Sequence, residues 1–310
     1  MDLRSKFIGG MIGSALGDAI GELAFEFPDK NTLLNKVARS QLHRYTDDTA
    51  MAIGLAESIV EKGDIDPQHL GDRFQSNFVA EPWRGYASGP PTVFALVKRH
   101  KISYLKAAKT LFGGQGSLGN GAAMRIVPVA LFFHDTPGLL HKARLSAQVT
   151  HAHPVGMDGA AIQALAIARA VDLDPLETFS RDFFIEELIA AAQTREIKEK
   201  MILVSHLLAE GAPPEEAADR LGHSVAVHES MPFAIYAFAR YPKSFEACLL
   251  CAVLHGGDRD TLGAMAGAIS GAYLGIHAIP SDWVARLENR SYLEELAINL
   301  YTIHTGKQGS

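Results

Sequence analysis

Two short acidic stretches carry the residue types best suited to chemistry in this sequence of 310 residues. Each stretch places two carboxylates beside a threonine: Thr46-Asp47-Asp48-Thr49 and Asp258-Arg259-Asp260-Thr261. Both stand where a helix-forming run begins, so either could cap a helix by accepting its free first-turn N–H groups. Adjacent ionised carboxylates repel each other, however, unless a positive charge lies between them. A hard divalent cation prefers oxygen ligands, and the pattern therefore indicates capping, metal binding, or both.

The repetition of this acidic pattern favours metal binding. A single carboxylate is enough for a cap, whereas the two stretches together contain four carboxylates. With two threonine hydroxyls they offer enough oxygen ligands for one or two magnesium-like ions.

A glycine-rich loop and a histidine pair are further candidates for ligand contact. The run from Phe112 to Gly121 contains five glycines and precedes a helix that we expect to begin at Ala122. Its backbone N–H groups and the helix dipole could bind an anion, with a simple turn as the alternative. The run matches neither the Walker nor the dinucleotide fingerprint. His151 and His153 lack a third ligand at a zinc spacing, which favours a hydrogen-bonding histidine over a transition-metal site.

The elements that must position these residues are predicted to be helices almost throughout. Apolar residues recur at helical spacing, and alternating β-branched runs are nearly absent. We therefore expect an all-α fold in a single domain, residues 1–310, with a long irregular segment over 22–44. The expected helices cover 5–20, 49–61, 91–100, 120–133, 157–172, 182–193, 198–209, 231–240, 245–255 and 262–276.

Two of these helices carry a stripe of glycines spaced four residues apart, Gly9, Gly13, Gly17 and Gly21 in the first and Gly263, Gly267, Gly271 and Gly275 in the last. Each glycine costs up to about 1 kcal/mol inside a helix, so two stripes need a structural reason. Glycine stripes let helix backbones approach closely. We expect both helices at the crowded centre of the fold, and the spacing does not say whether they touch each other.

The composition limits the possible function classes. The net charge of −6 argues against a nucleic-acid-binding protein, which usually has a basic footprint. No signal-peptide pattern and no run of eighteen apolar residues is present, so we expect no membrane span. The only cysteines, Cys248 and Cys251, lie in an apolar helical run without partner ligands. We interpret them as core thiols of a cytoplasmic protein.

Taken together and in order, the motifs resemble the ADP-ribosylglycohydrolase (ADP-ribosylhydrolase) family. Within it, the sequence looks most like the branch that cleaves serine-linked ADP-ribose. The glycine loop and the run Ser-Ala-Gln-Val-Thr-His are close to the corresponding motifs of that branch. The matching motifs are Gly-Asp-Ala-Ile-Gly (17–21), Tyr-Thr-Asp-Asp-Thr-Ala-Met (45–51), Arg-Gly-Tyr-Ala-Ser-Gly (84–89), Gly-Ser-Leu-Gly-Asn-Gly-Ala-Ala-Met-Arg (116–125), Thr-His-Ala-His (150–153), Gly-Gly-Asp-Arg-Asp-Thr (256–261) and Met-Ala-Gly-Ala-Ile-Ser-Gly-Ala-Tyr-Leu-Gly (265–275).

The resemblance implies a compact all-α fold with a binuclear Mg²⁺ centre, Mn²⁺ being possible. By motif match the metal ligands would be Thr46, Asp47, Asp48, Asp258, Asp260 and Thr261. The substrate-binding residues would be Phe112, Gly116, Ser117, Leu118, Gly119, Asn120 and His151. Phe112 would lie near the adenosine, and Ser117, Gly119 and Asn120 would belong to the phosphate and ribose loop.

Three positions depart from the family pattern. The family commonly has a glutamate eight residues after the glycine of the Gly-Asp motif, gating the metals, but this sequence has Phe25 there. We carry the role to Glu26, with Glu22 as the alternative. Leu118 stands where the serine branch has an aromatic residue. Arg259 replaces a small residue between the two metal aspartates.

We therefore expect a Mg²⁺-dependent hydrolase that releases ADP-ribose from modified proteins. The glycosidic bond would break through an oxocarbenium-like state, with Glu26, Asp47 or Asp260 assisting proton transfer. Arginine-linked, poly- or O-acetyl-ADP-ribose are alternative substrates, and a non-catalytic ADP-ribose-binding relative is a further alternative. The expected partners are ADP-ribose and ADP-ribosylated proteins, without nucleic acid or membrane, and we expect a monomer.

Overall fold

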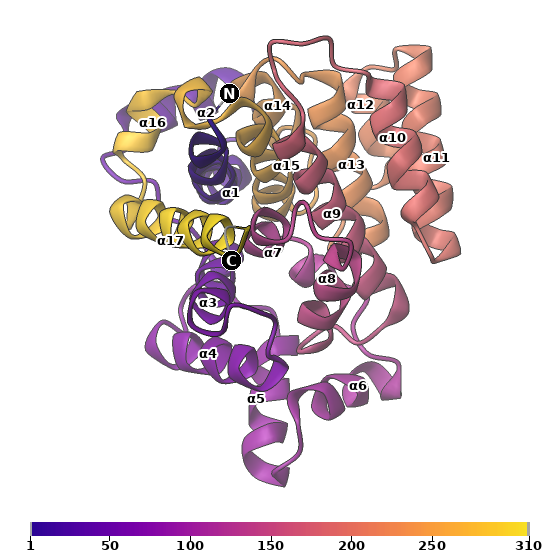
Figure 1. The fold of residues 1–310 in the computed structure, drawn as a ribbon. Coiled ribbons are helices and arrows are strands. Elements are labelled where there is room, and N and C mark those ends of the chain that lie inside the picture. Colours follow the sequence, from indigo (N-terminus) through magenta and orange to yellow (C-terminus); the bar gives the residue numbers. More distant parts are fainter. Residues whose placement is uncertain (1, 309–310) are drawn as a thin grey trace.

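The computed structural model describes residues 2–308, and within this range the chain forms α-helices and two 3-10 turns but no strand. The prediction of an all-α fold is confirmed (Figure 1). The helices are α1 (Leu3–Glu26), α2 (Lys30–Arg39), α3 (Asp47–Lys62), α4 (Pro67–Ala80), α5 (Gly89–His100), α6 (Tyr104–Gly114), α7 (Val127–Phe132), α8 (Leu139–Gln148), α9 (Pro154–Asp172), α10 (Arg181–Ala191), α11 (Arg195–Glu210), α12 (Pro214–Leu221), α13 (Val227–Arg240), α14 (Phe245–Val253), α15 (Arg259–Leu274), α16 (Ser281–Ala285) and α17 (Arg290–Gln308), with 3-10 turns η1 (Asn120–Ala122) and η2 (Ile276–Ala278).

Helices α1 and α15 lie against each other at the centre, and their glycine stripes form the contact (Figure 1). A Cβ atom added to Gly17 would lie 1.9 Å from the carbonyl oxygen of Gly263, and one added to Gly263 would lie 2.1 Å from that of Gly17. Gly13 and Gly9 face Gly267 and Gly271 in the same way. Because the register runs in opposite directions along the two stripes, the helices are antiparallel. The expectation of two central helices is confirmed, and the two helices touch through their backbones.

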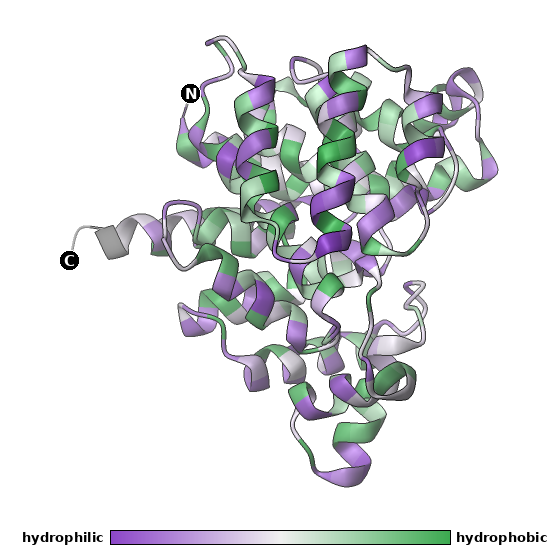
Figure 2. Cartoon of the chain, turned by 90° about the vertical axis from the view of Figure 1, so that its right-hand side faces the viewer, coloured by the Kyte–Doolittle hydropathy of each residue, from purple (hydrophilic) through white to green (hydrophobic). Residues whose placement is uncertain are grey.

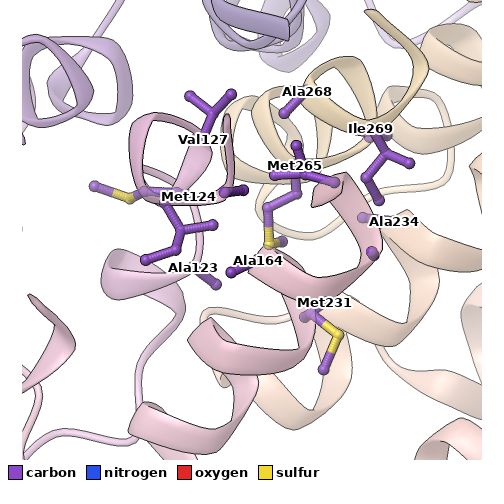
Figure 3. Close-up of a cluster of buried hydrophobic side chains, with 14 of the residues drawn as sticks. Ala123, Met124, Val127, Ala164, Met231, Ala234, Met265, Ala268 and Ile269 are labelled. Carbon is purple, nitrogen blue, oxygen red and sulfur yellow. The ribbon is translucent and has the colours of Figure 1, made fainter. Parts of the chain in front are cut away.

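The remaining helices surround this pair. Helices α9, α13 and α14 pack on α15, while α3, α7 and α17 pack on α1. Figure 2 shows green apolar segments turned toward the interior, with purple polar segments prominent on the outward turns. Figure 3 shows one part of the core, where α9, α13, α15, α7 and the turn before α7 meet through Ala164, Met231, Met265, Val127 and Met124. This packing fixes the first turns of α3 and α15 relative to α1.

The predicted helix over 120–133 is wrong as a continuous element. Asn120–Ala122 is a single 3-10 turn, and α7 begins only at Val127. Pro128 stands in the first turn of α7, where its missing N–H costs no hydrogen bond, so the helix starts there. The glycine loop therefore does not lead into an α-helix at Ala122, and a helix dipole at that point cannot bind an anion.

The expected irregular segment over 22–44 is also wrong, since it contains the end of α1 and all of α2. Asp29 caps α2 by accepting hydrogen bonds from the N–H groups of Asn31 and Thr32. Leu33 and Val37, spaced four apart, form its buried face. Helices α4, α6, α8, α12, α16 and α17 were not predicted either, and they complete the shell around the centre.

Cys248 and Cys251 are buried free thiols, as expected. Among residues 2–308, every helix is too short or too polar to cross a lipid bilayer.

Candidate active site

Asp18 organises the first acidic stretch from a different helix. It is fully buried in α1, and its carboxylate accepts hydrogen bonds from the backbone N–H groups of Thr46 and Thr49 at 3.0 Å each. The two threonine hydroxyls also donate to Asp18, at 2.8 and 2.6 Å. Asp18 thus supplies the acceptor that an N-cap side chain would supply to α3. Thr46 itself, at the N-cap position, makes no capping hydrogen bond with its side chain.

Neither acidic pair is used as a helix cap. Asp258 stands at the N-cap of α15 without a capping hydrogen bond from its side chain. Asp48 accepts only from the Thr46 hydroxyl, at 3.2 Å, and its other oxygen, Oδ1, is buried with no hydrogen-bond partner. Apart from one hydrogen bond from the Thr261 N–H to Asp260 Oδ1, at 2.9 Å, the carboxylates of the two stretches therefore do not cap the helices. The carboxylates remain available for another positively charged or hydrogen-donating group.

Asp18, Asp47, Asp48 and Asp260 have raised pKa values, and the charges of neighbouring carboxylates contribute to the shifts of the last three. Burial is the largest cause in each case, raising the pKa of Asp18 to about 6, that of Asp47 to about 7 and that of Asp260 to about 8. The pKa of Asp48 lies well above its usual value, because burial is joined by the charges of the other four carboxylates, Asp260 first. Arg125 lowers the pKa of Asp47, but its effect is smaller than those of burial and of Asp18. In this arrangement too little positive charge lies nearby to balance the negative charges of the ionised carboxylates.

A divalent cation fits this donor set. Asp48 Oδ1 is a buried acceptor without a donor, and the surrounding ligands are carboxylate and hydroxyl oxygens, which Mg²⁺ prefers. Thr261 is buried at the cavity wall beside Asp260. Thr46 donates its hydroxyl hydrogen to carboxylates and keeps its oxygen lone pairs. All six predicted metal ligands therefore come from the first turns of α3 and α15 or the residues just before them.

Asp47, Asp48, Asp258 and Asp260 lie in one wall of a cavity of about 520 Å³. Together with the buried Asp18, they form what we call the acidic cluster. This volume suits a ligand of the size of a dinucleotide fragment. The cavity brings together most of the residues predicted from the sequence. Its lining includes Asp47, Asp48, Asp258, Asp260 and Thr261 on one side and Phe112, Gly116, Ser117, Leu118, Gly119, Asn120 and His151 on the other.

The glycine loop is tied to the acidic cluster through Asn120. The amide Nδ2 of Asn120 donates to Asp258 Oδ2 at 2.7 Å and to the hydroxyl of Ser230 at 3.1 Å. Both of its hydrogens are thus used inside the protein, which leaves the amide oxygen for other contacts. Its backbone N–H donates to the carbonyl of Val225 at 2.9 Å. Asn120 therefore orients the Asp258 carboxylate in addition to lining the cavity.

Sequence reasoning missed the segment before α13 that completes the cavity wall. Val225 and Ala226 line the cavity, and Gly119 pairs with Ala226 in an isolated bridge. Neither residue type carries chemistry, so nothing in the sequence pointed to them. Asp18 was also missed, although an aspartate inside an apolar, glycine-striped helix was a usable signal.

His151 meets the glycine loop as a neutral hydrogen-bond donor. Burial, assisted by the charge of Arg125, lowers the pKa of His151 to about 3. Arg125 donates to the Thr150 hydroxyl at 2.8 Å, and that hydroxyl lies 2.8 Å from Nδ1 of His151. When the hydroxyl donates to Nδ1, the ring proton is on Nε2, beside Gly119 and Gly121. A Cβ at Gly121 would lie 2.8 Å from the ring, so glycine is needed there.

Apolar side chains stand exposed around the cavity. Phe112 is 66% exposed and has a positive φ of 50°, which turns the chain sharply at the end of α6. Leu118 and Val225 are exposed as well. Such a set offers surfaces on which a flat aromatic ligand group can stack.

Glu26, the residue predicted to gate the metals, is exposed at the last position of α1 and is not among the cavity-lining residues. Glu22 lies one helical turn earlier and is likewise exposed and not among the cavity-lining residues. Its charge raises the pKa of Asp260, and the neighbouring Gly21 packs on the backbone of Arg259 and Asp260. Glu22 is therefore the glutamate whose charge reaches the acidic cluster.

Comparison with known proteins gives a consistent match along the whole chain. A sequence model described as ADP-ribosylglycohydrolase matches residues 1–309. The chain is 32% identical to a protein of Bos taurus and to one of Homo sapiens, both called ADP-ribosylhydrolase ARH3, over 96% of this chain and 93% of each relative. An uncharacterized protein of Archaeoglobus fulgidus is 31% identical over 97% of this chain.

A solved structure has the same fold. It is described as an ADP-ribosylglycohydrolase-related protein complex, and it superposes with a TM-score of 0.74 at 25% sequence identity. The match covers 98% of this chain and 99% of that one.

Proposed function

Because the chain belongs to the ADP-ribosylglycohydrolase family and is thus a glycohydrolase, we propose that it releases ADP-ribose from serine side chains of modified proteins with Mg²⁺ as cofactor. The observation that carries the proposal is the buried, mutually repelling set of carboxylates in the cavity wall, with one oxygen of Asp48 lacking any donor. Two Mg²⁺ ions are the cofactor that this oxygen set suits best, with Mn²⁺ as an alternative.

The cavity residues divide between the two ends of ADP-ribose. Phe112 offers a face for the adenine, and the neutral His151 can donate Nε2–H to a phosphate or ribose oxygen beside Gly119. The ribose bearing the scissile bond would lie over Asp47, Asp48 and Asp260. When bound, the metal ions would act as Lewis acids that orient hydroxyl groups and lower the pKa of a water.

A carboxylate must also transfer the proton to or from the reacting oxygen atoms. We assign this role to Glu22, because its charge acts on Asp260, and keep Glu26 as the alternative. Asn120 holds Asp258 in place through its 2.7 Å hydrogen bond and thereby positions a ligand of the cation.

The test is release of ADP-ribose from a serine-linked ADP-ribosylated peptide, with Mg²⁺ and with a chelator. We expect turnover that needs the metal and falls by at least about 100-fold in the Asp260→Asn variant, as is common when one group that stabilises the transition state is removed. Asp219→Asn, on an exposed face of α12, is the matched control. Unchanged turnover in Asp260→Asn would overturn the metal-dependent mechanism.

Two further comparisons refine the assignment. Parallel peptides with arginine-linked ADP-ribose, and poly- and O-acetyl-ADP-ribose, distinguish the linkage, and faster cleavage of any of these would replace serine as the substrate. Glu22→Gln and Glu26→Gln distinguish the proton-transfer residue. We expect the larger loss of kcat in Glu22→Gln. ADP-ribose binding by calorimetry without turnover of any substrate would indicate a non-catalytic relative.

A further inference from the structure

A second cluster of metal-ligating side chains lies outside the acidic cavity. His134 and Asp135 follow α7, and His304 lies in α17, which packs beside α7 (Figure 1). One ring nitrogen from each histidine and one carboxylate oxygen of Asp135 lie within 4.8 Å of one another. None of the three residues lines the cavity.

The hydrogen bonds on the far side of both rings fix which nitrogen can bind a metal. Nδ1 of His134 lies 2.8 Å from a carboxylate oxygen of Asp172, and Nδ1 of His304 lies 3.0 Å from the carbonyl oxygen of Phe132. Both oxygens can only accept, so each Nδ1 carries a hydrogen. In the neutral rings each Nε2 therefore presents its lone pair. Histidines that bind metals are usually held in this way, by a carboxylate or a backbone carbonyl on the other nitrogen.

Both histidine side chains are largely shielded from solvent. The side chains of His134 and His304 are only 9% and 6% exposed. Nε2 of His134 is buried and has no hydrogen-bond partner within the described residues. Nε2 of His304 lies 3.8 Å from Asp135 Oδ2, and the Asp135 side chain is 39% exposed, which leaves it room to move closer. The ring centroids of the histidines are 4.8 Å apart, and the Phe7 ring packs against both, with centroids at 6.0 Å from His134 and 5.8 Å from His304.

We propose that His134, His304 and Asp135 form a Zn²⁺ site that fastens α17 to the loop after α7. Two imidazoles and one carboxylate match a zinc site with three protein ligands and a water in the fourth position. Imidazole nitrogen favours zinc over Mg²⁺, so the site would not compete for the cation of the acidic cavity. Asp172 is a positioning residue that holds the His134 ring.

The experiment measures Zn²⁺ binding to the full chain by calorimetry, with Mg²⁺ in excess to occupy the acidic cavity. We expect one Zn²⁺ per chain and a higher melting temperature when zinc is added. His134→Gln and His304→Gln should each abolish this binding. Asp172→Asn should weaken it by about 10- to 100-fold, the usual effect of changing a residue that orients a metal ligand.

The matched control is His141→Gln, an exposed histidine in α8, which should bind zinc as the unaltered chain does. Melting curves without zinc establish that each variant is folded. Failure of the unaltered chain to bind zinc would overturn the proposal, and so would equal binding in the His134→Gln and His304→Gln variants. Zinc binding that disappears only in Asp48→Asn would assign the ion to the acidic cavity and also overturn it.

Discussion

At the scale of single residues, Asp48 is expected to lower the stability of the metal-free protein while serving the proposed cation site. Its carboxylate is buried among four others, and one oxygen has no donor. Asp48→Asn removes a charge with little change in shape. In the metal-free protein at about pH 8 we expect the free energy of unfolding to rise, because the substitution removes one buried charge from a set of like charges.

The same variant should lose the stabilisation that Mg²⁺ gives, together with most of the turnover. Thermal melts with a chelator and with Mg²⁺ measure both effects, and Asp219→Asn again serves as the control. If Mg²⁺ raised the melting temperature of Asp48→Asn as much as that of the unaltered chain, Asp48 would not be a ligand.

Thr150 links two buried side chains whose roles differ. It accepts a hydrogen bond from Arg125 and lies 2.8 Å from Nδ1 of His151. Thr150→Val keeps the shape and removes both interactions, leaving an N–H of Arg125 without this acceptor. We expect a loss of about 1–3 kcal/mol in stability. Because the His151 ring is no longer fixed in one tautomer, KM should rise while kcat changes little. Steady-state kinetics distinguish a change in KM from a change in kcat. A fall in kcat alone would contradict this role for Thr150.

At the scale of helices, α1 and α15 form the most extensive helix–helix contact among the described residues. Gly17→Ala would place a Cβ 1.9 Å from a backbone oxygen of Gly263, and neither backbone can move without disturbing the other glycine pairs. We expect a loss of more than about 3 kcal/mol in the free energy of unfolding, at the upper end for overpacking. Urea denaturation measures it.

Gly306→Ala is the matched control for this substitution, because Gly306 lies in α17 with no atom of the described part of the chain within 4 Å of its added Cβ. There we expect a change of at most about 1 kcal/mol, in the stabilising direction. Equal effects at the two positions would show that glycine matters in α1 for its flexibility rather than for close packing.

How much of the helical arrangement could be predicted depended on whether the signal was local. The glycine stripes predicted that α1 and α15 are central, because each stripe lies within a single helix and can be recognised from local sequence spacing. The hydrophobic periodicity could not predict the break between Asn120 and Val127, because apolar residues continue through it. The turn is fixed instead by hydrogen bonds that Asn120 donates to the distant residues Val225 and Asp258. Helix α2 was missed because its apolar face is only a few residues long.

The candidate site followed the same rule. Asp47 and Asp260 could be found because each belongs to a short motif that occurs twice. The contacts of Asp18 are formed with Thr46 and Thr49 of another helix, which no local spacing records. Whether Glu22 or Glu26 acts on the carboxylates depends on how α1 meets α15, which local spacing does not record, and both remain candidates.

At the scale of the whole molecule, the acidic cluster makes the stability of the metal-free protein depend on pH. Burial raises the pKa of Asp18, Asp47 and Asp260 to about 6, 7 and 8, whereas an unfolded aspartate titrates near about 3.9. Between these values the folded chain holds protons that the unfolded chain has released. The contribution of these groups is therefore full below about pH 4 and is lost as the pH rises through about 6 to 8.

Urea denaturation with a chelator should accordingly give a free energy of unfolding that is lower by several kcal/mol at about pH 8 than at about pH 5. Saturating Mg²⁺ should remove or reverse this difference, because it favours the ionised carboxylates. A metal-free protein that gained stability over the same pH range would contradict the raised pKa values.

The contact between Gly17 and Gly263 also bears on how the protein is made. Nearly the whole sequence separates the two residues, so α1 leaves the ribosome long before its partner exists. At typical rates of synthesis the wait is roughly 10 to 50 s. During that time α1 has no surface on which to pack its glycine stripe, and closing so long a loop is slow. The nascent chain cannot assemble the acidic cavity before α15 has been translated, and until then its apolar helices are potential substrates for chaperones.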